Sequence, residues 1–348
     1  MIKILNRPIS IKHRPFIIAE MSANHNQSLS NALKIIDKAK QAGVDAIKIQ
    51  TYTPDTLTIK SSRKEFTITD KSSIWYKQSL YNLYKKAYTP WDWHQKIFDY
   101  SKKKGLICFS SPFDLSAVEV LKKLNCPAYK IASFEINNLP LIENVAKLKK
   151  PLIISTGLAT FKEIKNAVIT AKKNGCKKII LLKCTSTYPS NPKDSNIKTI
   201  NDLKKQFKCE VGISDHTKGI GVSVASIAYG STVIEKHFTL DRKLGGVDSE
   251  FSLEPNEMKS LVDEATRAWS SLGKKKYGPT KSELSSLKFR KSIFVVKDIK
   301  KGEVFCDDNI KIIRPNIGLE PKFYKRIIGK IAQKNLKKGT PLKKTHFQ

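Results

Sequence analysis

Short runs of β-branched and other apolar residues alternate along the chain with longer segments whose apolar positions recur every three or four residues. Such runs are typical of buried strands, and the longer segments are typical of amphipathic helices. Eight strands are predicted, at residues 16–20, 46–50, 106–110, 128–133, 152–156, 178–184, 211–214 and 233–237. Helices are predicted at residues 29–42, 93–104, 116–124, 140–148, 161–174, 200–206, 219–229 and 255–272. Eight strand–helix units favour a closed (β/α)₈ TIM barrel over an open doubly wound sheet.

Two further segments do not fit this alternation. Residues 51–88 form an insertion rich in Tyr, Thr and Ser, with few regular patterns. Because the active site of this fold lies at the carboxyl ends of its strands, we expect the insertion to be functional. After the last helix, the polar Gly- and Pro-containing residues 273–286 predict a linker, and residues 287–348 predict a small β-rich domain. The barrel domain therefore comprises residues 1–272.

The charge of the chain is extreme, with 64 Lys and Arg against 31 Asp and Glu and a formal net charge of +33. This excess would suggest nucleic acid or an anionic membrane as a partner. However, only eight of the cations are Arg, and the lysines are scattered over predicted helix faces. Nucleic-acid recognition relies heavily on Arg, so we expect no nucleic-acid partner; salt-dependent retention on DNA would support the alternative.

The cysteines and the apolar stretches bear on the cellular compartment. The six Cys are dispersed without a Cys-x-x-Cys pair, which argues against a zinc knuckle or a redox pair. Charge and proline interrupt the N-terminal residues before a signal-length apolar core, and no apolar stretch approaches about 20 residues. We therefore expect a soluble cytoplasmic protein with reduced thiols and no membrane contact.

Two histidines follow neighbouring predicted strands. His216 comes directly after residues 211–214 and an aspartate, and His237 ends residues 233–237. Parallel neighbouring strands lie about 4.8 Å apart, so one divalent metal could contact both imidazoles at the same end of the barrel. A hydrogen-bonded core histidine is the alternative for each.

Hydroxyl groups and lysines gather at the predicted strand ends. The hydroxyls are Ser110, Ser111, Ser133, Ser155, Thr156, Thr185, Ser186 and Ser214. Helix capping explains part of this enrichment, but a ring of donors also suits a phosphate or carboxylate. Strand alternation points Lys48 into the barrel, and Lys130 and Lys183 repeat its pattern. A bound anion would supply the counter-charge that a buried ammonium needs; a salt bridge to Glu20 or Glu135 is the alternative.

Carboxylates also lie at the predicted mouth of the barrel. They are Glu20, Glu135, Asp215, Glu235 and Asp248. Glu20 is the best candidate for a general acid or base, because Asn24, His25 and Asn26 share the mouth with it and can position a carboxylate and its water. For each carboxylate a purely structural role is the alternative.

With these residues placed, the chain resembles the sialic acid synthase family along nearly its whole length. The blocks that carry the resemblance are AEMSANHN (19–26), KIQTY (48–52), FSSPFD (109–114), YKIASFE (129–135), ISTGLAT (154–160), LLKCTSTYP (181–189), GISDHT (212–217), EKHFTLDR (235–242) and GGVDSEFSLEP (245–255). FRKSIFVVKDIKKGEVF (289–305) and RPNIGLEP (314–321) resemble that family's antifreeze-like (SAF) domain. Within the family, SANHN (22–26) and LYNLYKKAYTPWDWH (80–94) are most similar to pseudaminic acid synthases.

The resemblance implies an enzyme, a transferase of the EC 2.5.1 type that condenses phosphoenolpyruvate with an open-chain amino sugar and releases phosphate. The acceptor it favours is a 2,4-diacetamido-2,4,6-trideoxy hexose of the altrose type; an N-acetylmannosamine-type acceptor, giving N-acetylneuraminate or legionaminic acid, is the alternative. An apolar wall from aromatics such as Tyr81, Tyr84 and Trp91 would suit the missing 6-hydroxyl, although these could be ordinary core residues.

The same resemblance assigns roles to single residues. His216 and His237 match metal ligands for Mn²⁺, Mg²⁺ or Co²⁺, and Glu20 matches the catalytic carboxylate. The phosphoenolpyruvate pocket maps onto Lys48, Ser111, Lys130, Ser133, Ser155, Ser186 and Ser214, with Glu135 beside it. Tyr188 and Asp248 match sugar contacts, and Arg314 matches an arginine lent to the partner's barrel in a domain-swapped homodimer. A Schiff-base aldolase using Lys130 or Lys183 is a second enzymatic interpretation.

Overall fold

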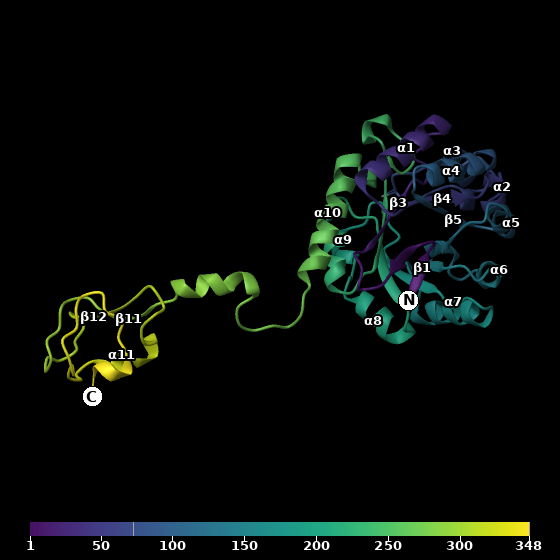
Figure 1. Cartoon of the computed structure of the whole chain (residues 1–348). Coiled ribbons are helices and arrows are strands. Elements are labelled where there is room, and N and C mark those ends of the chain that lie inside the picture. Colours follow the sequence, from purple (N-terminus) through teal and green to yellow (C-terminus); the bar gives the residue numbers. More distant parts are fainter. Residues whose placement is uncertain (72, 348) are drawn as a thin grey trace. The chain divides into compact units, whose positions relative to one another are not determined.

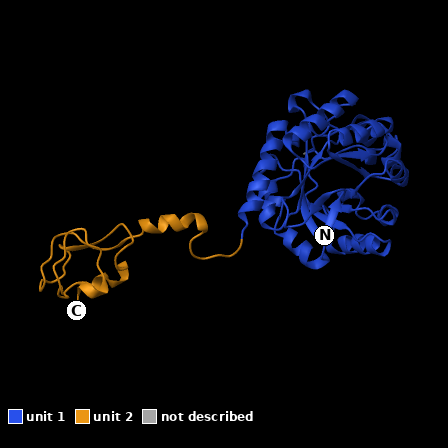
Figure 2. Ribbon diagram, in the orientation of Figure 1, with its two compact units in different colours: residues 1–273 blue, residues 274–348 orange. Residues whose placement is uncertain are grey.

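The computed structural model describes residues 1–71 and 73–347, and the chain divides into two compact units, Met1–Gly273 and Lys274–Gln348 (Figures 1 and 2). The division falls beside residue 272, where we expect the barrel domain to end. Part of the expected linker is helical, because the 3₁₀ helix η6 covers Lys281–Phe289. Each unit contains its own cluster of buried apolar side chains.

Unit 1 is a closed barrel of eight parallel strands in the order β10-β3-β4-β5-β6-β7-β8-β9, which confirms the predicted (β/α)₈ fold. The strands are β3 (Phe16–Glu20), β4 (Ala46–Thr51), β5 (Ile107–Pro112), β6 (Tyr129–Ile131), β7 (Leu152–Ser155), β8 (Ile179–Cys184), β9 (Glu210–Asp215) and β10 (Val233–His237). Their residues are mostly buried and apolar, since helices cover the outside of the sheet. The buried charged residues on these strands are Glu20, Lys48, Lys130, Asp215, Glu235 and Lys236.

The predicted helices surround the barrel (Figure 1). They are α1 (Leu29–Ala42), α4 (Trp91–Lys103), α5 (Leu115–Lys123), α6 (Leu139–Lys147), α7 (Phe161–Lys173), α8 (Thr199–Phe207), α9 (Gly221–Ala228) and α10 (Pro255–Ser271). Local chemistry sets several of their ends. Ser28 caps the first turn of α1, and Gly43 ends that helix at φ 84°, a left-handed conformation that favours glycine.

A hairpin that the strand pattern did not predict packs beside the amino ends of the barrel strands. Its strands are β1 (Ile2–Ile4) and β2 (Arg7–Ile9), and Ile4 and Ile9 join the barrel core. Asp45, just before β4, binds Arg7 at 2.8 Å and Arg14 at 2.9 Å and accepts the backbone N–H of Ile17. The Asp45 carboxylate therefore links the hairpin and the start of β3 at the amino end of the barrel.

The insertion after β4 is more regular than its sequence suggests. It contains α2 (Pro54–Leu57), the 3₁₀ turn η1 (Lys64–Phe66) and α3 (Leu80–Ala87). A backbone bridge pairs Thr67 with Ser79. Further 3₁₀ turns in the connections of unit 1 are η2 (Ser133–Glu135), η3 (Pro192–Asp194), η4 (Arg242–Leu244) and η5 (Ser249–Phe251).

Unit 2 packs a small core around a two-stranded sheet. Strands β11 (Ser292–Val295) and β12 (Ile310–Ile313) are antiparallel, and η7 (Pro321–Phe323), α11 (Tyr324–Ile327) and η8 (Lys344–His346) follow. The similar segments DIKKGEVF (298–305) and NLKKGTPL (335–342) pair through the Ile299–Leu336 bridge. Arg314, directly after β12, is exposed.

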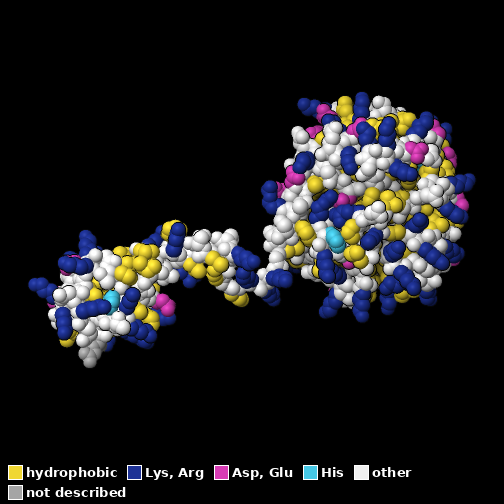
Figure 3. Space-filling view, viewed as in Figure 1, with side chains coloured by type: hydrophobic (Ala, Val, Ile, Leu, Met, Phe, Trp, Pro, Cys, Tyr) yellow, Lys and Arg dark blue, Asp and Glu magenta, His cyan; other side chains and the backbone are white. Residues whose placement is uncertain are grey.

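The surface carries the excess positive charge diffusely. On the face shown in Figure 3, Lys and Arg side chains are spread over both units and are interspersed with other types. All six cysteines are free. Among the described residues, none of the helices combines the length and the apolar character needed to cross a membrane.

Candidate active site

Two lysines and two glutamates form an ion cluster inside the barrel mouth. Lys48 on β4 lies 2.5 Å from Glu20 on β3 and 3.8 Å from Glu235 on β10. Lys130 on β6 lies 3.4 Å from Glu235. All four side chains are buried. A buried ammonium group needs a counter-charge, and here the two glutamates supply it to both lysines. The salt-bridge alternative therefore holds for Lys48 with Glu20, whereas the partner of Lys130 is Glu235 and not Glu135.

The two carboxylates of this cluster differ in proton affinity. Burial alone would raise the pKa of Glu235, but Lys130, Lys48 and the Ser214 hydroxyl, which donates to Glu235 at 2.9 Å, lower it to about 2. For Glu20, burial prevails over the attraction of Lys48 and raises the pKa above its ordinary value. One carboxylate thus stays charged while the other takes a proton more readily, as acid–base sites require.

Hydroxyl and amide groups surround the ion cluster. Lys48 Nζ donates to Ser111 Oγ at 3.3 Å, and the Gly157 N–H donates to Ser133 Oγ at 3.2 Å. Ser155 Oγ is buried and has no hydrogen-bond partner among the described residues. These groups have donor capacity left for an anion, in line with the predicted ring of hydroxyls.

Gly157 was not identified from the sequence, although its position in the site is tightly constrained. A Cβ atom there would lie 2.2 Å from Ser186 Oγ and 2.7 Å from Ser133 Oγ. Real Cβ contacts are never this short, so the backbone of residue 157 closely approaches both hydroxyls. The signal that could have found it is the glycine directly after the strand-end hydroxyls in ISTGLAT (154–160).

Lys183 does not join the other two lysines. Its Nζ donates to the carbonyl oxygen of Cys184 at 2.8 Å and contacts the Thr185 hydroxyl at 3.4 Å. Cys184 is the neighbour that turns toward the mouth, with its Sγ 3.8 Å from Ser186 Oγ and 3.9 Å from His216 Nδ1. The expectation that Lys183 repeats the pattern of Lys48 is therefore wrong, because the inward face of β8 carries Cys184 instead.

The two histidines meet at the mouth. The ring centroids of His216 and His237 are 5.3 Å apart, and both side chains are buried. Earlier on the same two strands, Gly212 lets β9 approach β10, because a Cβ there would lie 2.2 Å from the carbonyl oxygen of Val233. Tyr188 packs on His216 at 4.4 Å between centroids. The predicted pairing of the two rings is thus present in the structure.

The surroundings of the two rings leave nitrogen atoms available to a metal. His216 Nδ1 donates to the carbonyl oxygen of Thr185 at 2.9 Å, which leaves Nε2 with its lone pair. Burial, together with the neighbouring positive charges, holds the pKa of His237 well below its ordinary value, and its Nδ1 has no hydrogen-bond partner among the described residues. A neutral imidazole is the form that binds metal. The structure brings no group of three or more His, Cys, Asp or Glu together as a metal site in its described part.

A cavity of about 750 Å³ lies above these groups. Ser22, Gln50, Glu135, Ser186, Tyr188, His237 and Asp248 contribute its polar lining. Gln50 donates to Glu20 at 3.0 Å and to Ser22 at 2.9 Å, and Ser22 donates to Asp248 at 2.5 Å. This chain of hydrogen bonds connects the ion cluster to the cavity wall, and Gln50 and Ser22 are members that sequence reasoning missed.

Glu135 lines the cavity and is not ion-paired with Lys130. Burial raises its pKa to about 7, with Lys130 opposing the shift only in part. Its Oε2 atom is buried without a hydrogen-bond partner among the described residues. Near neutral pH this carboxyl group can therefore hold a proton and donate it to an oxygen in the cavity.

The insertion supplies an apolar wall to the same cavity. The apolar and aromatic lining residues include Tyr52, Leu57, Leu80, Leu83, Tyr84, Ala87 and Phe113. Of the three aromatics proposed for this wall, only Tyr84 lines the cavity. Tyr81 instead donates to Asp55, and Trp91 donates to the carbonyl oxygen of Tyr52, so both hold the insertion in shape.

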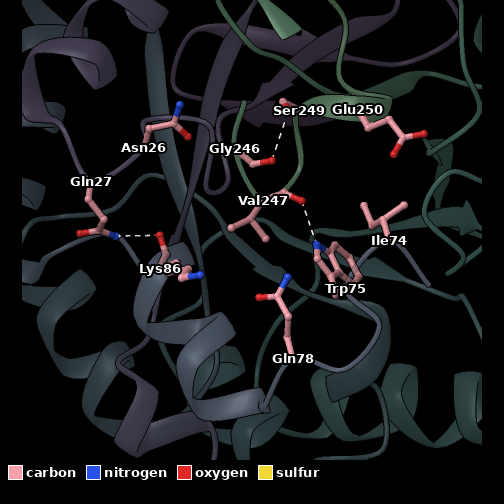
Figure 4. A pocket seen from close by; sticks show the side chains of 10 residues that line it. All are labelled: Asn26, Gln27, Ile74, Trp75, Gln78, Lys86, Gly246, Val247, Ser249 and Glu250. Carbon is pink, nitrogen blue, oxygen red and sulfur yellow. Dashed lines mark hydrogen bonds between the residues drawn. The ribbon is translucent and has the colours of Figure 1, made fainter. Parts of the chain in front are cut away.

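A second cavity, of about 580 Å³, lies beside the first (Figure 4). Trp75 and Val247 line both cavities, and Trp75 Nε1 donates to the carbonyl oxygen of Val247 at 2.9 Å. Figure 4 shows this bond beside Gln78, with Gln27 and Lys86 linked by another. The indole and the Val247 backbone therefore form part of the boundary between the two spaces.

The residues expected to position Glu20 have other roles. Asn24 donates to the carbonyl oxygen of Phe238 and to Ser252, each at 2.9 Å, and Asn26 donates to the Gly245 carbonyl. His25 is fully buried against Trp93. These three side chains hold the loop after β3, while Lys48 and Gln50 position Glu20.

The chain is similar to known proteins in both sequence and fold. A sequence model of the NeuB family matches residues 35–277, and one of the SAF domain matches residues 290–348. The chain is 48% identical to the pseudaminic acid synthase of Campylobacter jejuni over 96% of both chains. It is 44% identical to that of Helicobacter pylori over 94% of this chain and 96% of the relative. A crystal structure of N-acetylneuraminic acid synthetase from Leptospira borgpetersenii superimposes with a TM-score of 0.73 at 36% identity, covering 83% of this chain and 95% of that one.

Proposed function

This chain belongs to the NeuB family, and from that premise we propose that it is a pseudaminic acid synthase, a transferase that condenses phosphoenolpyruvate with a 2,4-diacetamido-2,4,6-trideoxy hexose. In this reaction carbon 3 of phosphoenolpyruvate bonds to the aldehyde carbon of the open-chain sugar. Water adds to carbon 2, and phosphate leaves. The observation that carries the proposal is the juxtaposition of the buried Lys48 and Lys130 with the histidine pair beneath the apolar-walled cavity.

The phosphate and carboxylate of phosphoenolpyruvate would lie among the lysines and hydroxyls. Lys48 and Lys130 supply positive charge, and Ser111, Ser133, Ser155, Ser186 and Ser214 are placed around them. The strands fix the positions of these donors before the substrate arrives, so they would stabilise developing negative charge once the anion has redistributed the existing ion pairs. Ser155, whose hydroxyl lacks a partner among the described residues, would gain one on binding.

His216 and His237 would hold a divalent cation, Mn²⁺, Mg²⁺ or Co²⁺. When bound, the cation would polarise the aldehyde oxygen of the acceptor. The protein holds the two rings in fixed orientation: His216 is oriented by the Thr185 carbonyl, and His237 stands 3.8 Å from Asp248. Two protein ligands leave room for substrate and water.

Glu20 would move the proton of the attacking water. It lies between Lys48 and Gln50, so its carboxylate orientation is fixed from both sides. Asp248, Glu135 and Tyr188 line the cavity where the sugar hydroxyl and acetamido groups would lie. Leu57, Leu80 and Leu83 would face the 6-methyl end of the acceptor.

We also propose that the active form is a homodimer in which Arg314 of one chain completes the barrel of its partner. Arg314 is exposed in unit 2, in the segment that resembles the family's lent arginine. We place the reaction in the cytoplasm, in keeping with six free cysteines.

Phosphate release from phosphoenolpyruvate tests this function directly. The full chain is incubated with trideoxy diacetamido hexoses, N-acetylmannosamine and mono-acetamido deoxysugars, each with and without a chelator. Fastest release with the trideoxy acceptor of the altrose type, abolished by the chelator, is expected. Preference for N-acetylmannosamine would instead assign an N-acetylneuraminate-type synthase.

One observation favours a Schiff-base aldolase as a second candidate: burial lowers the pKa of Lys130, which would make its amine more nucleophilic. Borohydride with pyruvate distinguishes the two mechanisms. We expect no trapped adduct, because Lys130 is held as an ion pair with Glu235. A stable adduct on Lys130 would contradict the condensation mechanism.

A further inference from the structure

A second buried ion pair lies on strands β9 and β10, on the face opposite to the one that carries His216 and His237. Lys236 Nζ is 2.9 Å from Asp215 Oδ2, and the two side chains are 0% and 1% exposed. Lys236 and Asp215 are register partners, so the pair joins the two strands directly before His237 and His216. Because successive strand residues face opposite sides, the ion pair and the histidines occupy the two faces of one place in the barrel.

The pair also holds the backbone that follows His216. Asp215 Oδ1 accepts the Thr217 N–H at 2.9 Å and the Thr217 hydroxyl at 2.7 Å. Lys236 Nζ donates to the Thr217 carbonyl oxygen, and Ser223 of α9 donates to Asp215 Oδ2 at 2.6 Å. Thr217 is therefore bound through its amide, its hydroxyl and its carbonyl, which fixes the chain on the far side of the His216 ring.

Stability alone does not account for this choice of residues. Burying an ammonium and a carboxylate costs desolvation energy, and an apolar pair of similar volume is often as stable or more so. Apolar side chains are also buried on the same strands, among them Val211, Ile213 and Ile234. An ion pair with fixed hydrogen bonds does, however, specify one geometry, which apolar side chains do not.

We propose that Asp215 and Lys236 are positioning residues that set the spacing and orientation of His216 and His237 for the metal. This inference rests on the proposed role of the two histidines as metal ligands. Groups that orient metal ligands from behind typically change metal affinity by 10- to 100-fold when removed. Neither residue lines either of the two cavities described above, so the effect of the pair on phosphoenolpyruvate binding should be small.

The test is isothermal titration calorimetry, in which Mn²⁺ is titrated into the metal-free full-length enzyme. The double variant Asp215→Leu/Lys236→Met replaces the charges with apolar groups. We expect its unfolding temperature to lie within a few degrees of that of the natural protein, but its Kd for Mn²⁺ to be at least about 10-fold higher. Its kcat should recover at high Mn²⁺, which a general structural defect would not allow. Lys259→Met/Asp263→Leu, in an exposed pair of α10, is the matched control and should change nothing.

Two further variants keep the outcome decisive. If the double variant does not fold, Asp215→Asn preserves the shape, and its Mn²⁺ affinity should fall several-fold. Natural Mn²⁺ affinity in whichever variant folds would overturn the inference, provided that His216→Ala binds Mn²⁺ weakly. If His216→Ala also binds Mn²⁺ normally, the histidines are not the ligands, and both the inference and the proposed metal role fail.

Discussion

At the scale of single residues, the mouth of the barrel combines charges that would be costly to bury separately. In the cluster of Lys48, Lys130, Glu20 and Glu235, each charged group lies within 4 Å of at least one group of opposite charge. Formally these charges cancel, so an arriving anion would have to redistribute the existing pairs. Gly157 and Gly212 contribute through the side chains they lack, since each allows a contact that a Cβ would prevent.

Gly157→Ala should weaken binding of phosphoenolpyruvate, because its Cβ would displace the hydroxyls of Ser186 and Ser133. We expect the KM for phosphoenolpyruvate to rise roughly 10-fold or more, equivalent to at least about 1.4 kcal/mol. Steady-state kinetics with circular dichroism would measure this. Gly221→Ala is the matched control, since nothing lies within 4 Å of its added Cβ. Equal kinetic effects of the two changes would contradict the role of Gly157.

Two buried histidines away from the mouth predict how stability depends on pH. His25 Nδ1 accepts the Gln27 N–H, and His94 Nδ1 donates to the Pro90 carbonyl while Nε2 contacts the Thr51 hydroxyl. Burial lowers the pKa of each from 6.5 to about 4. The unfolded chain therefore binds more protons than the folded chain between these values, and the free energy of unfolding falls as the pH drops from 6.5 toward 4.

The expected size of this effect follows from the proton affinities. Each tenfold difference in proton affinity between the folded and the unfolded chain corresponds to about 1.4 kcal/mol. Titration of His94 should therefore lower the free energy of unfolding by about 2 kcal/mol when the pH falls from 7.5 to 5. Urea unfolding at the two pH values should show His94→Gln losing that much less stability than the natural chain. An identical loss in both proteins would show that His94 binds protons equally in the folded and the unfolded chain, which would contradict the prediction.

At the scale of elements, the strands and the insertion divide the work of the site. Strand ends hold the ion cluster, the hydroxyls and the histidines, whereas α2, α3 and the intervening loop form the apolar wall. Loops on a rigid barrel tolerate change more readily than its strands. Acceptor preference should therefore depend on the insertion more than on the strands.

Leu80→Asn should alter the preference for the sugar without altering phosphoenolpyruvate binding. Leu80 lines the cavity at the start of α3, and a polar group there would be placed against the 6-methyl end of the acceptor. We expect kcat/KM for the 6-deoxy acceptor to fall about 10-fold, as one lost apolar contact predicts, with the KM for phosphoenolpyruvate within about twofold. Competition between acceptors with and without a 6-hydroxyl gives the readout. Ile59→Asn, 60% exposed in the same insertion, is the control; an equal fall for both acceptors would refute the assignment.

Periodicity predicts the regular elements well because the barrel is built from local patterns. The eight strands and their helices appear within two residues of the expected ends, and Lys48, Lys130 and both histidines lie where alternation places them. Partners distant in sequence could not be predicted in this way. Glu235 as the partner of Lys130, and the Gln50–Ser22–Asp248 chain, depend on how neighbouring strands align. Lys183 was misplaced because its strand presents Cys184 inward.

At the scale of the whole molecule, the two units each have a core, and the proposed dimer would join them through Arg314. The described barrel contains the lysines, hydroxyls, histidines and cavity of the site, whereas Arg314 belongs to Lys274–Gln348. Symmetric homodimers present the same complement twice, so each chain would both lend and receive an arginine.

Mixed dimers test this exchange. Arg314→Ala and His237→Ala chains should each be inactive alone, because one lacks the lent arginine and the other lacks a metal ligand. Co-expressed, the mixture should regain about a quarter of the natural activity, since half of the dimers would contain one complete site of two, and dimers purified through both tags should have about half of it. Size-exclusion chromatography with activity measurement on doubly tagged dimers gives the result. Mixtures as inactive as either parent would mean that Arg314 does not act across the dimer.

The continuity of residues 51–88 has a practical consequence. This one segment of the sequence supplies most of the apolar lining of the cavity, and no residue of the ion cluster belongs to it. Grafting this one stretch between related synthases should carry sugar choice with it while the machinery for the enol phosphate stays in place. Synthases with a new acceptor preference would thus need a change in residues 51–88 only, while the strands of the barrel stay the same.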